Sequence, residues 1–169
     1  MPDDRVIRTS TQTEPTSPGS FGASYDAANR MFFRLYQASN LMHRTGTRAV
    51  AGHGATTQQW AVMGALSRPG VTDTGMSVKE LMALLAVSRQ SLTMVLNRLE
   101  GLSLVERVRL ASDGRIRRIR LTQQGHTTWS GMLVDIRGFY IAATAEFSPG
   151  DVEQLTQLLD RLAVKLTTL

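Results

Sequence analysis

The sequence predicts a mainly α-helical protein with one small β-hairpin. Apolar residues recur at helical spacing over most of the chain, and helix-capping sequences stand between these segments. One Asp-Gly pair, a strong hairpin signal, is flanked by two short strand-like runs. The 169 residues, 42% of them hydrophobic, suit one domain with an extension.

The N-terminal segment divides into an arm and a helix. Residues 1–22 are rich in Ser, Thr, Pro and Asp, which predicts a disordered arm. A helical pattern follows from Tyr25 to about Val50, with a broad apolar face made of Met31, Phe32, Leu35, Tyr36, Ser39, Leu41 and Met42. Gly46, Gly52 and Gly54 are expected to weaken its end and form a loop.

The next segment predicts three short helices. Thr56-Thr-Gln-Gln59 resembles a capping box, and Arg68-Pro-Gly70 ends the helix that it opens. A flexible stretch is expected up to Met76. Ser77-Val-Lys-Glu80 is a second capping box for a helix to about Leu85, and Ser88 can cap the third helix.

The third helix has two contrasting faces. One buried stripe is expected at Leu92, Val95, Leu96, Leu99 and Leu102. The opposite side carries side chains that hydrogen-bond base edges in the major groove of DNA, where Arg suits guanine and Gln or Asn suits adenine. These candidate DNA-binding residues are Ser88, Arg89, Gln90, Ser91, Thr93, Asn97 and Arg98.

An arginine-rich hairpin follows this helix. Leu104–Leu110 and Arg115–Leu121 are predicted strands, joined by a turn at Ala111-Ser-Asp-Gly114. Asp113 is the only counter-charge expected for the arginines at 107, 109, 115, 117, 118 and 120. A helix-turn-helix followed by such a hairpin is typical of a winged helix-turn-helix DNA-binding domain, which adds Arg107, Asp113, Arg115 and Arg117 to the candidate DNA contacts.

Two more helices are predicted after the hairpin. Thr122 begins a long helix with an apolar period from Trp129 to Ala143. Ser148-Pro-Gly-Asp151 starts the last helix, whose apolar side carries Val152, Leu155, Leu158, Leu159, Leu162 and Leu166. Apolar faces of this size need something to bury against, which favours a homodimer over a purely intramolecular helical core.

The charge lies in one part of the chain. The 19 basic residues are 17 Arg and 2 Lys, and residues 56–121 hold 10 basic and 5 acidic groups, equal to the whole net charge of +5. Arg binds phosphate through a planar fork of donors. Together with a sequence pI near 10.4, this predicts an anionic partner.

Several classes of function are disfavoured. The absence of Cys excludes disulfides and thiol redox sensing, and no run of 18 apolar residues or secretory signal is present. We therefore expect a cytoplasmic protein with no membrane partner. No P-loop, G-x-S-x-G or H-E-x-x-H motif occurs, and the three histidines are scattered, so we expect no enzyme, cofactor or metal site.

Four segments together resemble the MarR family of transcriptional regulators: Ser77–Leu85, residues 88–102, Leu104-Val-Glu-Arg107 and Asp113-Gly-Arg115…Leu121-Thr122-Gln-Gln-Gly125. The resemblance covers residues 25–167 and also includes Thr57-Gln-Gln-Trp60. Ala86 and Ser103 depart from it, because family members often have Gly there, where a positive φ is easily adopted.

The resemblance implies a homodimer on a pseudo-palindromic operator, expected to be a repressor released by a small organic ligand. It implies a dimerisation helix and loop at 23–55, the winged domain at 56–121 and C-terminal dimerisation helices at 122–169. The sequence leaves open the operator, the regulated genes, the effector and the sign of regulation. The alternative function is a winged-helix adaptor that binds protein without specific DNA binding.

A ligand cleft is implied between the dimer helices and the winged domain. Cations beside apolar walls would suit an aromatic carboxylate. The candidate lining residues are Arg30, Arg34, His43, Arg48, Trp60 and Met63. The alternative is that Trp60 and Met63 belong to the core and the arginines are only solvated.

Overall fold

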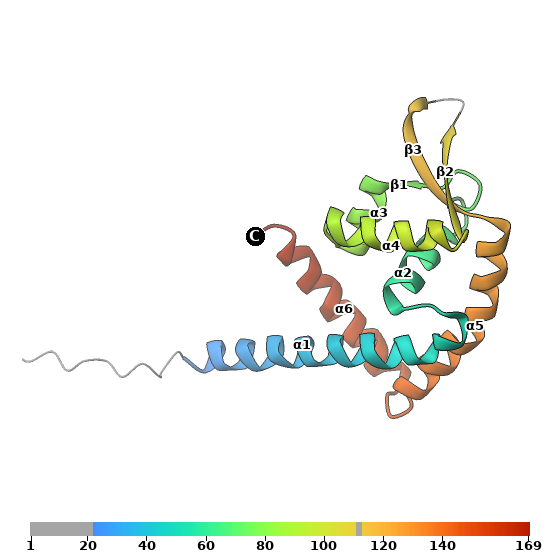
Figure 1. Ribbon diagram of the computed structural model, residues 1–169. Helices are drawn as coiled ribbons and strands as arrows, with labels where there is room; N and C mark the ends of the chain where they lie inside the picture. The colour runs from blue at the N-terminus through green and yellow to red at the C-terminus, as the bar shows by residue number, and fades with distance from the viewer. Residues whose placement is uncertain (1–21, 111–112) are drawn as a thin grey trace, which may run out of the picture. The chain divides into compact units, whose positions relative to one another are not determined.

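The computed structural model describes residues 22–110 and 113–169 and confirms the predicted fold class (Figure 1). Its described residues form two compact units, one up to Ser39 and one from Asn40 to Leu169, and each is described by itself. The helices are α1 (Ala23–Ala49), the 3-10 helix η1 (Ala51–His53), α2 (Thr57–Leu66), α3 (Val78–Leu85), α4 (Arg89–Gly101), α5 (Gln123–Ala143) and α6 (Pro149–Leu166). The strands are β1 (Met76–Ser77), β2 (Val105–Leu110) and β3 (Asp113–Leu121).

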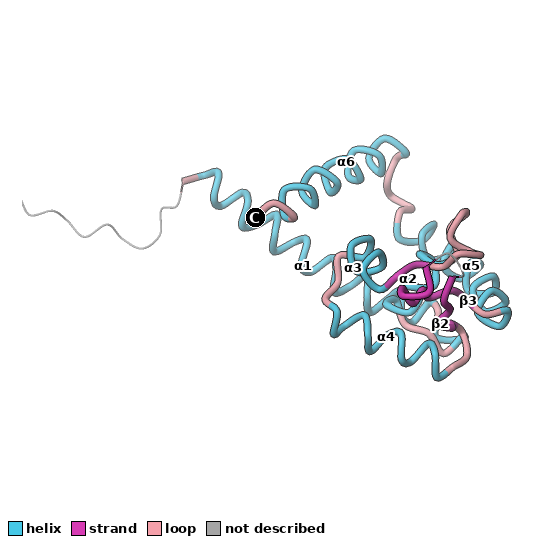
Figure 2. The backbone as a smooth tube through the Cα atoms, turned by 90° about the horizontal axis from the view of Figure 1, so that it is seen from above, coloured by secondary structure: helices cyan, strands magenta, loops and turns pink. Residues whose placement is uncertain are grey.

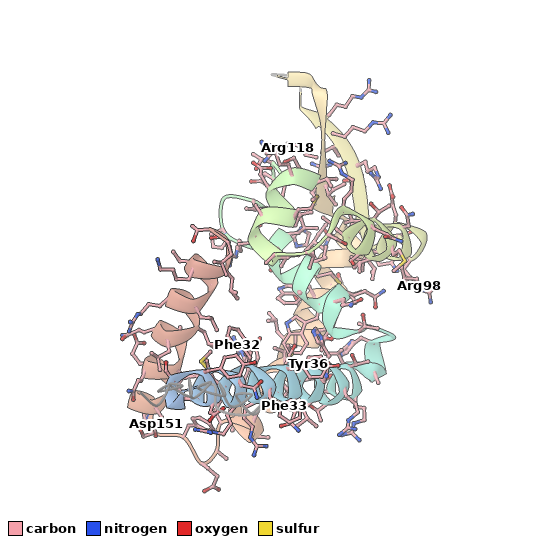
Figure 3. All side chains as sticks on the ribbon, turned by 90° about the vertical axis from the view of Figure 1, so that its left-hand side faces the viewer. Phe32, Phe33, Tyr36, Arg98, Arg118 and Asp151 are labelled. Carbon is pink, nitrogen blue, oxygen red and sulfur yellow. The ribbon has the colours of Figure 1, made fainter. Side chains whose placement is uncertain are left out.

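The first unit consists of the N-terminal part of α1. Its large apolar side chains are exposed except for the half-buried Leu35, and Phe32, Phe33 and Tyr36 project from the helix (Figure 3). Arg34 donates a hydrogen bond to Gln37 one turn later. The apolar face predicted for this helix is therefore present on its N-terminal part, and most of its side chains there are exposed.

The core of the second unit lies where α2, α3 and α4 meet the sheet and α5. Figure 2 shows these elements grouped around the strands. Three of the five predicted stripe residues of α4, Leu92, Leu96 and Leu99, are buried, and Val95 and Leu102 are partly buried against the core. The other fully buried side chains are Val50, Val62, Met63, Leu66, Leu81, Ile119, Met132 and Ile136. The sheet order is β1-β3-β2 with antiparallel pairing, so β3 is the central strand.

The predicted helix starts are confirmed. Complete capping boxes join Thr56 to Gln59, Ser77 to Glu80 and Ser148 to Asp151. The hydroxyls of Ser88 and Thr122 accept hydrogen bonds from the amides of Ser91 and Gly125, which caps α4 and α5. Each bond satisfies an amide that lacks a partner in the first helical turn.

Three local predictions differ from the structure. Gly46 does not lie in a loop: it is buried inside α1, where a Cβ would meet the Thr57 methyl group at 2.7 Å. The strand β1, which pairs Met76 with Ile119, was not predicted at the end of the flexible stretch expected up to Met76. Asp113 is not at a turn tip but pairs with Leu110 as the first residue of β3, while Ala111 and Ser112 lie outside the described residues, as does the arm 1–21.

The two positions that depart from the family pattern keep a left-handed backbone. Ala86 ends α3 with φ 51°, and Ser103 follows α4 with φ 57°. At the end of α4, the amide of Leu104 donates to the carbonyl of Leu99, as in a Schellman motif. The carbonyl of Ser103 also accepts the hydroxyl of Thr122 at 2.7 Å. Non-glycine residues therefore hold a conformation that glycine would adopt without strain.

The last helix carries exposed apolar side chains. Figures 1 and 2 show α6 running apart from α2, α3 and α4. Val152, Leu155, Leu158 and Leu159 are 40–50% exposed, and no residue of α6 is buried. The predicted apolar side of this helix is present and unpaired within the described part of the chain.

Candidate nucleic-acid interface and effector pocket

The polar face predicted for α4 points to solvent. All seven candidates from Ser88 to Arg98 are exposed. The hydroxyls of Ser88 and Ser91 bond to each other, and Thr93 donates to the carbonyl of Arg89 at 2.7 Å. The side chains of Arg89, Gln90, Asn97 and Arg98 form no hydrogen bond or ion pair with any described residue, so their donors are available to a partner.

The exposed face has a centre and two edges. Gln90, Thr93 and Asn97 follow one another at i, i+3 and i+7 and form the outermost line of the helix, opposite its buried stripe. Met94 belongs to the same line and is 66% exposed. Sequence reasoning missed it because an apolar residue is usually assigned to the core, although its i+4 spacing from Gln90 placed it outside. Arg89 and Arg98 flank this line, and Figure 3 shows Arg98.

The wing arginines are balanced by glutamates that the sequence analysis did not pair with them. Arg107 donates through Nε to both carboxylate oxygens of Glu100, at 3.0 and 3.1 Å. Arg120 donates to Glu106 at 2.7 Å, and Arg118 forms an ion pair with Glu80. The expectation that Asp113 alone neutralises these arginines is therefore wrong. The candidate DNA contact Arg107 is therefore already paired with Glu100.

Two wing arginines are unneutralised among the described residues. Arg109 and Arg117 are exposed, form no ion pair there, and stand directly opposite each other across β2 and β3. Facing like charges destabilise a strand pair. The pair lies on the sheet face that carries Val105, Ile119 and Leu121 into the core, farther along the hairpin. A bound anion would relieve this repulsion.

Asp113 and Arg115 are placed only by their backbone. Both belong to β3, and the ladder between β2 and β3 is irregular between Arg109 and Leu110. Their side chains lie outside the described part of the structure, so the contact predicted between them stays a prediction.

The residues predicted to line one ligand cleft separate into several places. His43 borders a cavity of about 230 Å³ between α1, α2, α3 and α4, and its Nδ1 lies 2.9 Å from the Thr57 hydroxyl. Trp60 borders a neighbouring cavity of about 280 Å³. The two cavities share Ala61 and Leu85.

The other predicted lining residues lie elsewhere. Met63 is fully buried at 0% exposure, because its position on α2 points into the core, in agreement with the alternative that it is a core residue. Arg48 is exposed and borders none of the described cavities near α2. Arg30 and Arg34 are exposed and belong to the first unit.

The cavity beside Trp60 combines aromatic walls with a cation. It is lined by Trp60, Ala61, Gly64, Ala65, Arg68, Leu84, Leu85, Trp129 and Tyr140. The ring centroids of Trp60 and Tyr140 are 5.6 Å apart. Burial raises the pKa of the Tyr140 phenol, which therefore keeps its proton at neutral pH and can donate it to an acceptor. A Cβ at Gly64 would lie 3.0 Å from the Trp129 ring, so this glycine leaves room for the indole.

Among residues 22–110 and 113–169, no three His, Asp or Glu side chains gather as metal ligands would. Within the same ranges, no helix has the length and apolar character needed to cross a bilayer.

Comparison with known proteins identifies relatives of this chain. Residues 53–116 match the sequence model of the MarR family. The transcriptional activatory protein BadR of Rhodopseudomonas palustris is 45% identical over 145 residues, which cover 83% of this chain and 82% of the relative. The homoprotocatechuate degradative operon repressor of Escherichia coli is 31% identical over 111 residues, which cover 66% of this chain and 72% of the relative.

A solved relative shows the same architecture. The structure of the Mycobacterium tuberculosis transcriptional regulator MosR in complex with DNA has 25% identity and a TM-score of 0.67, and the match covers 81% of this chain and 97% of that one. The exposed polar face of α4 and the adjacent wing suit a DNA-binding protein, and the similar proteins are transcriptional regulators. The chain belongs to the MarR family and is a DNA-binding transcriptional regulator.

Proposed function

We propose that this regulator binds a pseudo-palindromic operator as a homodimer, acts as a repressor in the cytoplasm, and is released by a small aromatic carboxylate. One observation carries the DNA part: α4 presents unpartnered Arg, Gln and Asn side chains beside a wing whose Arg109 and Arg117 lack a described counter-charge. The functional division at residues 55 and 121 is part of this proposal.

In the proposed interface, some residues read bases and others bind phosphates. Gln90 and Asn97 read base edges from the centre of α4, and Met94 contacts a thymine methyl group. Arg89 and Arg98 at the edges of the helix, with Arg109 and Arg117 on the wing, bind phosphates. Arg115 is proposed as a further wing contact and Asp113 as the group that orients it.

The effector is proposed to occupy the cavity beside Trp60. Trp60 and Trp129 offer faces for an aromatic ring, Arg68 offers a fork for a carboxylate, and Tyr140 offers a hydroxyl donor. The name of the E. coli relative supports this chemistry, because homoprotocatechuate is an aromatic ring with a carboxylate side chain. His43 borders the neighbouring cavity and is proposed to tune access to the same region.

The sign of regulation needs its own measurement. The E. coli relative is named a repressor and the R. palustris relative an activatory protein. An operator-controlled reporter should rise when the gene is deleted if the protein is a repressor. A fall on deletion would reverse the proposed sign and leave the DNA interface untouched.

The interface is tested by operator and random-sequence binding over a range of salt concentrations. Arg98→Ala should weaken both complexes equally and make the slope of log affinity against log salt shallower by about 1.8, from about 0.9 for each of two phosphate contacts in the dimer. Asn97→Ala should weaken only the operator complex, by roughly 1–3 kcal/mol for each base lost. Binding of neither DNA by the intact protein, with capture of a protein partner, would support the adaptor alternative instead.

A further inference from the structure

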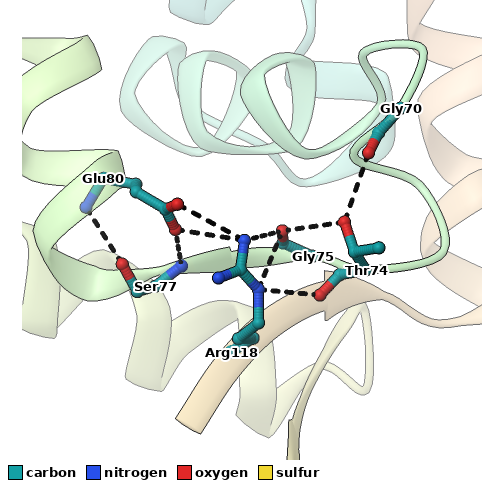
Figure 4. Close-up of polar contacts among 6 residues, drawn as sticks. All are labelled: Gly70, Thr74, Gly75, Ser77, Glu80 and Arg118. Atoms are coloured by element: carbon teal, nitrogen blue, oxygen red, sulfur yellow. Dashed lines mark hydrogen bonds and ion pairs between the residues drawn. The ribbon is translucent and has the colours of Figure 1, made fainter. Parts of the chain in front are cut away.

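Arg118 stands where the wing meets the entrance of the helix-turn-helix. It belongs to β3, opposite Ser77 of β1, and Ser77 is also the residue that caps α3. Its side chain is only 21% exposed, compared with 31% for Arg107 and 40% for Arg120. The direction of its guanidinium is therefore set by protein groups (Figure 4).

The guanidinium contacts three groups in two parts of the chain, the loop before β1 and the helix α3. Nε donates to the carbonyl of Thr74 at 3.0 Å, and Nη2 donates to the carbonyl of Gly75 at 2.8 Å. Nη2 also lies 3.2 Å from Oε2 of Glu80 on α3. Nε and Nη2 of the planar guanidinium thus bind the two carbonyls and the carboxylate at the same time. The single ammonium group of a lysine on its flexible stem does not reproduce this geometry.

Glu80 links this contact to the start of α3. Its Oε2 accepts the Ser77 amide at 2.6 Å, and its own amide donates to the Ser77 hydroxyl at 3.2 Å. The hydrogen bonds from Ser77 and the charge of Arg118 lower the pKa of this carboxyl. Glu80 therefore bears its negative charge in the folded protein at neutral pH and holds both the helix cap and the wing arginine.

The backbone beside this contact leaves little freedom. Gly75 has φ 67°, and a Cβ at this position would overlap the carbonyl oxygen of Ile119 on β3. β1 itself consists of only two residues, so the ladder alone provides few bonds between the wing and α3. Arg118 supplies the side-chain connection across this short strand.

We infer that Arg118 is a positioning residue for DNA recognition, which fixes the wing relative to the helix-turn-helix through Glu80 and the Thr74–Gly75 carbonyls. The inference rests on the proposed DNA interface. The recognition helix and the wing must contact two parts of the DNA at the same time. A wing that is not held in place has a lower effective concentration of its arginines at the DNA phosphates. Arg118 contributes to affinity through Arg109 and Arg117 and makes no phosphate contact of its own.

The first test compares variants by operator affinity and salt slope. Arg118→Met should weaken binding roughly 10-fold or more with an unchanged salt slope, because no phosphate contact is lost. Arg117→Ala should make the slope shallower by about 1.8, since each protomer loses one contact worth about 0.9. Arg120→Met is the matched control: it lies on the same strand, but its partner Glu106 belongs to the wing itself.

The second test separates charge from geometry. Arg118→Lys keeps the charge and should still weaken binding nearly as much as Arg118→Met, because a lysine cannot bridge the carbonyls and Glu80 together. Glu80→Gln retains a residue suited to the capping box and removes one negative charge from each protomer. It should weaken DNA binding, whereas bulk electrostatics predicts tighter binding. The double variant Arg118→Met with Glu80→Gln should be no weaker than Arg118→Met alone.

The outcomes distinguish the inference from the interface beneath it. Wild-type affinity in Arg118→Lys, or a shallower slope in Arg118→Met, makes Arg118 a simple charge or phosphate contact and overturns the positioning role. An unchanged slope in Arg117→Ala and Arg98→Ala overturns the proposed interface instead. Circular dichroism and thermal unfolding of each variant identify misfolding, and Arg118→Lys and Glu80→Gln, the mildest changes, decide the matter if Arg118→Met does not fold.

Discussion

Ala86 and Ser103 show how single residues carry strain in this domain. Each holds a left-handed backbone at the end of a helix of the helix-turn-helix, where an L side chain costs about 1–2 kcal/mol relative to glycine. The cost is tolerated because the turn after α3 and the chain reversal after α4 set the direction of α4 and β2. Both strained residues therefore lie at joints of the DNA-binding element.

We predict that Ala86→Gly and Ser103→Gly each raise the free energy of unfolding by about 0.5–1 kcal/mol. Relief of backbone strain favours the variant, while the greater entropy of glycine in the unfolded chain removes part of the gain. Urea unfolding at one fixed protein concentration measures the change. Gly75→Ala is the opposite control and should destabilise the protein, because the added methyl group has no space against Ile119. A loss of stability in both glycine variants would show that the two turns are unstrained.

At the scale of elements, the capping boxes of α3 and α6 share one electrostatic feature. Glu80 and Asp151 each accept bonds from their capping serine, which lowers the pKa of both carboxyls below their ordinary values of 4.5 and 3.8. A lowered folded-state pKa gives stability that is complete above the unfolded pKa and is lost as the pH falls through the folded one. Both helix starts are therefore weakened by acid.

We predict that Glu80→Gln flattens the acid limb of stability. The wild-type protein should lose more of its free energy of unfolding than the variant as the pH falls below 4.5, because the variant has no carboxylate to protonate. Above pH 6 the variant should be less stable, since its bond to Arg118 is no longer charge-assisted. Urea unfolding between pH 3 and pH 7, the range that spans the ordinary carboxyl pKa, measures both effects. Parallel curves would remove Glu80 as the source of the acid sensitivity.

Local features explain which elements the sequence revealed. Helix starts such as Ser77–Glu80 depend on contacts three residues apart, so the sequence predicts them directly. β1 was missed because its only partner, β3, lies about forty residues away and its two residues show no alternation. The Arg118–Glu80 contact was missed because its two residues also lie far apart in the sequence. The separation of His43 and Trp60 into neighbouring cavities was missed because it depends on how α2 packs.

At the scale of the whole molecule, exposed apolar side chains gather on the two terminal helices. Phe32 and Tyr36 on α1 and Leu155 and Leu158 on α6 are each more than 40% exposed, and burying one such side chain contributes about 1.5–3 kcal/mol. Family membership and these faces support the same homodimer. Two recognition helices held by one dimer would bind two half-sites together.

We predict that Leu155→Asp converts the dimer into monomers at micromolar concentration, because a charge would be buried in the apolar interface. Sedimentation velocity measures the change. Operator affinity should fall at least about 100-fold, because a monomer binds only one half-site. Val164→Asp is the matched control: Val164 is 65% exposed but lies on the opposite side of α6, so that variant should stay dimeric. Dimers in both variants would exclude the α6 face as part of the interface.

Binding of the effector and binding of the operator are expected to be coupled. If an aromatic carboxylate weakens operator binding by a given factor, operator DNA must weaken binding of that carboxylate by the same factor, about 5- to 150-fold for ordinary allosteric coupling. Homoprotocatechuate is the probe, titrated by calorimetry into the protein with and without operator DNA.

Arg68→Ala should lower the affinity for homoprotocatechuate at least about 10-fold by removing the partner of its carboxylate. Operator affinity in the absence of homoprotocatechuate should be unchanged. Arg48→Ala is the control, since Arg48 is also an exposed arginine but borders none of the described cavities near α2. Equal affinity with and without operator would exclude release by this ligand, and equal losses in both arginine variants would exclude the cavity beside Trp60 as its site.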